Sequence, residues 1–77
     1  MIDLKLERKK LLEKAIAEDR VTGRKMRDKR EDRGLKSGWV ATKMGISPGY
    51  LSDLERGNRH WRQHHIDSFL KAIGEQP

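Results

Sequence analysis

The fold of this chain is decided by residues 46–57, Ile46-Ser47-Pro48-Gly49-Tyr50-Leu51-Ser52-Asp53-Leu54-Glu55-Arg56-Gly57. The Ser47 hydroxyl can cap a helix N-terminus, and Pro48 suits the first helical position, where its missing N–H costs nothing. Leu51 and Leu54 lie on one helical face, and Gly57 can end the helix in the left-handed conformation. The pattern predicts a short helix over 47–56 with an apolar inner face.

A second short helix is predicted immediately before the first. It begins at Ser37, the expected N-cap, and runs to Met44, after which Gly45 supplies a tight turn. Two short helices joined in this way form a helix-turn-helix motif, whose second helix enters the major groove of DNA.

Two further helices are expected around this motif. Thr22 is a candidate N-cap with Val21 stapled onto Met26, and this helix would end near Arg33 at Gly34. The last helix would begin at residue 62 or 63 and close at residue 74. We therefore expect an all-α bundle of four to five helices over 21–74, an N-terminal extension over 1–20 and a tail over 75–77. The predicted core comprises Met26, Leu35, Val40, Ala41, Met44, Ile46, Leu51, Leu54, Ile66, Phe69, Leu70 and Ile73.

The extension is predicted to be an amphipathic helix. Leu4, Leu12, Ala15 and Ile16 fall near one face, and an isolated helix of this length is barely stable, so it should dock or fray. Trp39 is expected on the outer face of its helix, where an indole needs cover. We expect it to pack on the stripe over 4–16 or on a second subunit; the alternative is partial cover by Lys or Arg stems.

Composition favours a nucleic-acid partner. The 77 residues carry 18 Lys and Arg against 12 Asp and Glu, a net charge of +6. Seven bases against three acids fall within residues 21–36, whereas residues 37–57 are neutral. The chain has no cysteine, no apolar run long enough for a membrane span and no signal-peptide pattern, so a cytoplasmic location is expected.

Enzymatic chemistry is not expected. The sequence has no glycine-rich phosphate loop, no nucleophile with a base and too little chain for a closed pocket. His60 and His64 are four residues apart, but no further clear ligand lies near them, so we expect neither metal nor cofactor. Trp61 is interpreted as a core side chain beneath the last helix in preference to a base-stacking ring.

Residues 25–74 resemble the Cro/repressor-type (XRE-type, lambda-repressor-like) helix-turn-helix domain. The matching landmarks are Arg30, Gly34-Leu35, Ser37, Val40-Ala41, Met44-Gly45-Ile46-Ser47, Leu51, Leu54-Glu55-Arg56-Gly57, Ile66, Phe69 and Ile73. The resemblance implies a lambda-repressor-like bundle and a structural ion pair between Arg30 and Glu55. A carboxylate at the edge of the core favours such a bidentate partner.

Helical geometry places Pro48, Gly49, Ser52, Asp53 and Arg56 on the outer face of the recognition helix. The first four match the positions at which the family reads bases, yet they offer few side-chain hydrogen bonds, and Asp53 repels phosphate. Close backbone approach at Gly49 and flanking cations would then share the recognition. The full predicted DNA-binding set is Ser37, Lys43, Ser47, Pro48, Gly49, Tyr50, Ser52, Asp53, Arg56, Asn58, Arg59, His60 and Arg62.

The sequence thus predicts a sequence-specific DNA-binding transcriptional regulator, a small repressor of phage, prophage or antitoxin type. Such domains usually act as dimers on double-stranded DNA. The extension over 4–16 and Trp39 would then be available to a protein partner. The alternative is a protein-interaction module of the same fold with weak or no DNA binding, which the neutral face of helix 47–56 favours.

Overall fold

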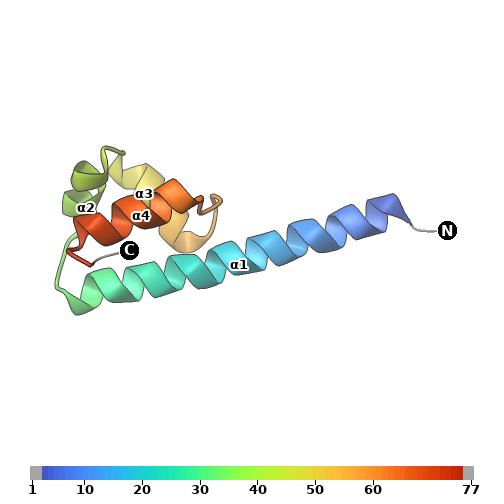
Figure 1. The fold of residues 1–77 in the computed structure, drawn as a ribbon, viewed down its shortest axis with the longest axis horizontal. Helices are drawn as coiled ribbons and strands as arrows, with labels where there is room; N and C mark the ends of the chain where they lie inside the picture. The colour runs from blue at the N-terminus through green and yellow to red at the C-terminus, as the bar shows by residue number, and fades with distance from the viewer. Residues whose placement is uncertain (1–2, 76–77) are drawn as a thin grey trace.

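A computed structural model describes residues 3–75, which contain four helices and no strand. They are α1 (Leu4–Asp32), α2 (Ser37–Met44), α3 (Pro48–Arg56) and α4 (Gln63–Ala72). Helices α2, α3 and α4 gather over the C-terminal half of α1, and its N-terminal half projects from the bundle (Figure 1). The molecule is accordingly elongated, with extents of 51 × 22 × 18 Å.

Helix α1 is one continuous element, which corrects the expected start at residues 21 and 22. Its N-cap is Asp3, whose side chain accepts hydrogen bonds from the Lys5 and Leu6 amides. Thr22 lies within the helix, and Val21 is 69% exposed, so neither the cap nor the staple exists. The extension and the first bundle helix are therefore a single helix, and the described bundle has four helices in all.

Close packing explains why a glycine, Gly23, stands in the middle of α1. A Cβ built on Gly23 would lie 2.5 Å from the Glu55 carbonyl oxygen, at the C-terminal end of α3. On the opposing side, a Cβ at Gly57 would lie 2.6 Å from Cγ of Arg20. Glycine at residue 23 is thus the contact point at which α1 crosses α3, although glycine in a helix costs about 0.5–1 kcal/mol relative to alanine.

The helix-turn-helix forms largely as expected, with one change at its start. Lys36, not Ser37, is the N-cap of α2, and it makes no side-chain capping bond. Gly45 ends α2 in the left-handed conformation at φ 74°. The Ser47 hydroxyl accepts the Tyr50 amide hydrogen at 3.1 Å, with Pro48 in the first turn of α3.

The core is built mainly by α2, α3 and α4, with Met26 as the contribution of α1. Its buried members are Met26, Val40, Ala41, Leu51, Leu54, Trp61, Phe69 and Ile73. Five other expected members pack around them half-buried, namely Leu35, Met44, Ile46, Ile66 and Leu70. Trp61 is 5% exposed and its ring meets Phe69 edge-on, which confirms its interpretation as a core side chain.

Trp39 does not pack on the extension. Helix α2, which carries it, lies at the far end of the bundle from the free half of α1 (Figure 1). The indole is 47% exposed, and the Lys43 ammonium lies 5.3 Å from its centroid, as the alternative of cover by a lysine stem predicts. The stripe is equally uncovered within the described chain, with Leu4 67% and Leu12 61% exposed.

Candidate nucleic-acid interface

Helix α3 presents a polar outer face opposite its buried leucines. Leu51 and Leu54 are fully buried against the core. Gly49 and Arg56 are exposed on the opposite side, and Ser52 and Asp53 are half-buried beside them. The helix is therefore held by its inner face, and its outer face is accessible to a bound molecule such as DNA.

Gly49 has open space around it. A Cβ built there meets no other atom of the described chain within 4 Å, and its φ is negative, as a helix requires. Nothing inside the protein thus requires glycine at this position. A requirement for glycine would have to come from a molecule that approaches from outside.

One flank of α3 borders a hollow of about 180 Å³. The hollow brings together three of the expected DNA-binding residues, Ser37, Ser52 and Arg56, with Arg27, Arg30 and Glu55. Arg27 was missed in the sequence analysis. It precedes Arg30 by three residues, which places both on one side of α1, and this spacing is the signal that could have found it.

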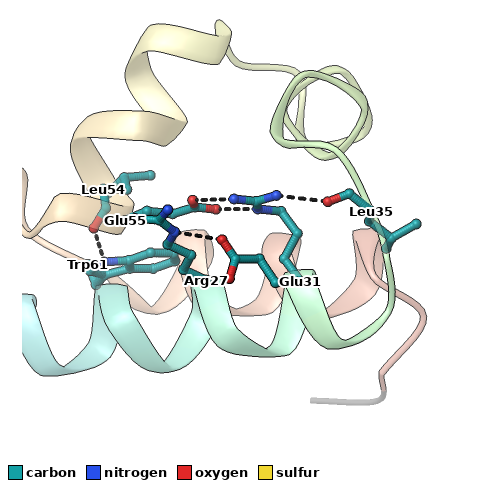
Figure 2. A network of polar contacts seen from close by, with 7 residues as sticks. Arg27, Glu31, Leu35, Leu54, Glu55 and Trp61 are labelled. Carbon is teal, nitrogen blue, oxygen red and sulfur yellow. Dashed lines mark hydrogen bonds and ion pairs between the residues drawn. The ribbon is translucent and has the colours of Figure 1, made fainter.

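The base of this flank is fixed by Arg30 and Glu55. Nε and Nη2 of Arg30 donate to the two Glu55 carboxylate oxygens at 2.8 and 2.9 Å, and Nη1 donates to the Leu35 carbonyl at 2.8 Å. Figure 2 shows the guanidinium between the Glu55 carboxylate and the Leu35 carbonyl. The hydrogen bond to Glu55 raises the pKa of Arg30, so the guanidinium stays charged. It joins α1, the α1–α2 loop and α3, and so fixes the orientation of α3.

The other flank of α3 carries Arg59. Its guanidinium carbon lies 4.4 Å from the Tyr50 ring centroid, and its Nε lies 3.5 Å from Oδ2 of Asp53. Both ends of this ion pair are about half exposed. The negative charge of Asp53 is therefore partly offset by a cation from the following loop, which reduces its expected repulsion of phosphate.

His60 faces α1. Its Nδ1 lies 3.0 Å from Oδ1 of Asp19, which also accepts the Trp61 amide hydrogen at 3.0 Å. The Trp61 indole donates to the Leu54 carbonyl at 2.6 Å (Figure 2). Asp19 was missed by sequence reasoning, because a single acid in a strongly charged helix carries no distinguishing pattern. The contact between His60 and Asp19 therefore attaches the loop after α3 to α1.

The remaining expected residues are dispersed. Lys43 lies beside Trp39 along a groove between α2 and α4. Asn58 and Arg62 are exposed at the two ends of the loop that carries Arg59. Ser47 and Pro48 are exposed at the N-terminus of α3. The structure thus gathers Ser37, Ser52 and Arg56 on one flank and Tyr50, Asp53 and Arg59 on the other.

Two other kinds of site have no counterpart in residues 3–75. No group of three or more His, Cys, Asp or Glu side chains is arranged to hold a metal ion. No helix in the same range combines the length and apolar character needed to cross a bilayer.

The geometry of α2, the Gly45 turn and α3 is that of a DNA-binding motif, and comparison with known families agrees. The family described as helix-turn-helix domain matches residues 22–77. The chain belongs to the helix-turn-helix domain family. No curated protein and no solved structure matches it. The matched region begins within α1 and leaves the projecting half of that helix outside the family's pattern, and membership supports a DNA-binding role for the rest.

Proposed function

We propose that the chain is a sequence-specific transcriptional regulator of the Cro/repressor type, a binding protein and not an enzyme. Helix α3 lies in the major groove of double-stranded DNA, as the second helix of this motif does. Ser52 and Asp53 face base edges, and the flanking cations contact phosphate, which positions the domain without reading sequence. A small repressor of phage, prophage or antitoxin type fits this size.

The observation that carries the proposal is the pair of cationic flanks beside an uncovered α3. Arg27 and Arg56 line the hollow on one flank, and Arg59 packs over Tyr50 on the other. A groove with phosphates on both of its walls presents charge to both flanks at once. Because the Arg30–Glu55 pair fixes α3 between them, little ordering is needed on binding.

The test is a polarisation titration with a duplex from the chain's own promoter and a scrambled duplex of equal length. We expect the promoter duplex to bind more tightly, and binding of both to weaken as salt rises. Replacing Arg59 and Arg62 by alanine should weaken binding to both duplexes and flatten the salt dependence. Replacing Ser52 or Asp53 should change the preference between duplexes.

A matched control removes the same charge elsewhere. Arg8 and Lys9 lie in the projecting half of α1, so their double alanine variant changes the net charge equally without touching the flanks. Equal weakening by the two double variants would show that only net charge matters. Undetectable binding by the unaltered chain at micromolar concentration, roughly the non-specific range, would overturn the DNA proposal.

Substitution of Gly49 tests whether the backbone of α3 lies close to DNA. Gly49→Ala has room inside the protein, and alanine favours helix over glycine, so stability should hold or rise. If the backbone at this turn contacts DNA, the methyl group should nevertheless lower the affinity severalfold. An unchanged affinity would remove close approach from the proposal.

The projecting half of α1 favours an additional role in protein association. Leu4, Leu11 and Leu12 are each more than 60% exposed on a helix that the bundle does not cover. We propose that this segment joins two copies into the dimer that binds two half-sites, or binds a protein partner, with Trp39 as a second contact. A chain that associates in this way without binding DNA is the alternative function.

Sizing across a range of protein concentrations tests the dimer. The unaltered chain should shift from monomer to dimer, and Leu11→Lys with Leu12→Lys should remain monomeric. The control is Val21→Lys, which replaces another exposed apolar side chain of α1. A monomer at every concentration would count against self-association and leave a different partner to be sought.

A further inference from the structure

Tyr50 is the only tyrosine of the chain, and its side chain is held from two sides. Its hydroxyl oxygen lies 3.2 Å from Nε2 of His65, the third residue of α4. The Arg59 guanidinium packs against its ring. Tyr50 belongs to the predicted DNA-binding set, and His65 does not.

The hydrogen bonds around His65 determine which of its nitrogens carries the proton. The Arg62 backbone N–H donates to Nδ1 of His65 at 3.1 Å. Nδ1 is therefore a hydrogen-bond acceptor and carries no hydrogen. A neutral imidazole with an accepting Nδ1 carries its hydrogen on Nε2. The ring must then donate from Nε2 to the Tyr50 hydroxyl oxygen.

This direction leaves the hydroxyl hydrogen of Tyr50 available. A phenol can accept one hydrogen bond and donate another. Within residues 3–75, His65 is the hydrogen-bond partner of this hydroxyl, and it occupies the accepting side. The hydroxyl can therefore donate a second hydrogen bond, and the Arg59 guanidinium adds positive charge over the same ring.

We propose that His65 is a positioning residue that orients the Tyr50 hydroxyl as a hydrogen-bond donor to a DNA backbone phosphate, with Arg59 as the adjacent cation. The inference rests on the proposed DNA-binding function. The hydrogen bonds then form a series in which each group donates to the next: the Arg62 N–H, the His65 ring, the Tyr50 hydroxyl and the phosphate. Fixing a donor before binding reduces the ordering that binding would otherwise require.

The surroundings of His65 keep the ring neutral. Its side chain is 7% exposed, and burial is the largest cause that lowers its pKa. The nearby charges of His64, Arg62 and His60 lower this pKa further. A hydrogen bond with the His60 backbone acts in the opposite direction. From α3 and its following loop, Tyr50 and Arg59 face the same site. Protonation would place a hydrogen on Nδ1 and break its bond with the Arg62 amide.

The first test requires no DNA. Ring ¹⁵N chemical shifts of the full chain at neutral pH should show His65 with hydrogen on Nε2 and a free lone pair on Nδ1. Tyr50→Phe should perturb the Nε2 signal and leave Nδ1 unchanged. Hydrogen on Nδ1 would overturn the inference, whether or not the chain binds DNA.

The second test measures coupling on the promoter duplex. Tyr50→Phe and His65→Leu should each weaken binding about tenfold, the usual scale of a hydrogen bond to a charged group. Together they should weaken it little more than either alone, because both remove the same donor. His65→Gln, whose amide can donate to Tyr50, should restore part of the loss.

Two controls separate positioning from folding. Ser68→Ala removes a neutral hydroxyl of α4 that lines the groove beside Trp39, and should leave affinity unchanged. The salt dependence of His65→Leu should match that of the unaltered chain, because no ionic contact is lost, whereas a disordered interface would lower it. Additive losses, or a lower salt dependence, would overturn the positioning role. Binding absent from the unaltered chain would overturn the proposed function as well, so the two failures are distinguishable.

Discussion

The two halves of α1 differ both in composition and in surroundings. Residues 4–18 contain exposed leucines and alternating charges, and no part of the bundle covers them. Residues 19–32 contain few large apolar side chains, yet they bury Asp19, Gly23, Met26 and Arg30. The difference shows that in this chain apolar side chains on a helical face do not by themselves make an interface.

Contact geometry explains which half is docked. Gly23 lets α1 approach the end of α3 closely, and Arg30 and Asp19 satisfy polar groups that this approach buries. The projecting half has no comparable partner, and it remains helical because a helix already nucleated can propagate one residue at a time. Its leucines are therefore available for association outside the bundle.

The largest expected effect comes from breaking the buried ion pair of the docked half. Arg30→Met leaves the Glu55 carboxylate without its partner at 6% exposure, and should lower the free energy of unfolding by about 3–5 kcal/mol. Arg27→Met removes a pair to Glu31 that is more than half exposed, and should barely move the midpoint. Urea unfolding of both variants measures the difference, and equal midpoints would contradict it.

Close packing is tested next, again within the docked half. Gly23→Ala forces a methyl group against the Glu55 backbone and should cost about 1–3 kcal/mol of unfolding free energy. Gly38→Ala in α2 meets nothing within 4 Å and should be neutral or slightly stabilising. A Gly23→Ala variant as stable as Gly38→Ala would mean that the crossing of α1 and α3 is looser than described.

The bundle should also lose stability in mild acid through His65. Its pKa is lowered in the folded state, so the unfolded chain binds the proton first as pH falls below about 6.5. The stabilising contribution is complete above that pH and is lost as pH falls toward the folded pKa. Unfolding free energies near pH 7.5 and near pH 5.5 should differ less in His65→Gln than in the unaltered chain, and an equal difference would show that His65 is not responsible.

The smallest effect is expected in the projecting half. Leu12→Ala removes a 61% exposed side chain and inserts a better helix former, so the monomer should unfold at an unchanged midpoint. The measurement belongs at low protein concentration. A loss above about 1 kcal/mol there would reveal an intramolecular contact, whereas a loss that grows with concentration would support the dimer.

Local signals in the sequence predicted the helix-turn-helix well. Ser47, Pro48, Gly45 and Gly57 act through their own backbone neighbourhood, so their positions fix helix ends without reference to the rest of the fold. The same kind of signal failed at Val21 and Thr22, which lie inside α1. The neighbouring Gly23 allows α1 to pack closely on α3. Because this contact is not visible in the local sequence, Thr22 resembled a helix N-cap although it lies within α1.

By itself, the sequence determined an all-helical chain, the short helices α2 and α3, the apolar face of α3 and the positive charge. Each follows from residue periodicity, caps or composition. Only the tertiary structure decided that α1 is continuous, that Arg27 joins the hollow beside Ser52, and that His65 contacts Tyr50. These facts depend on atoms far apart in sequence meeting within a few ångströms, and no local pattern encodes which of many charged or aromatic side chains will meet.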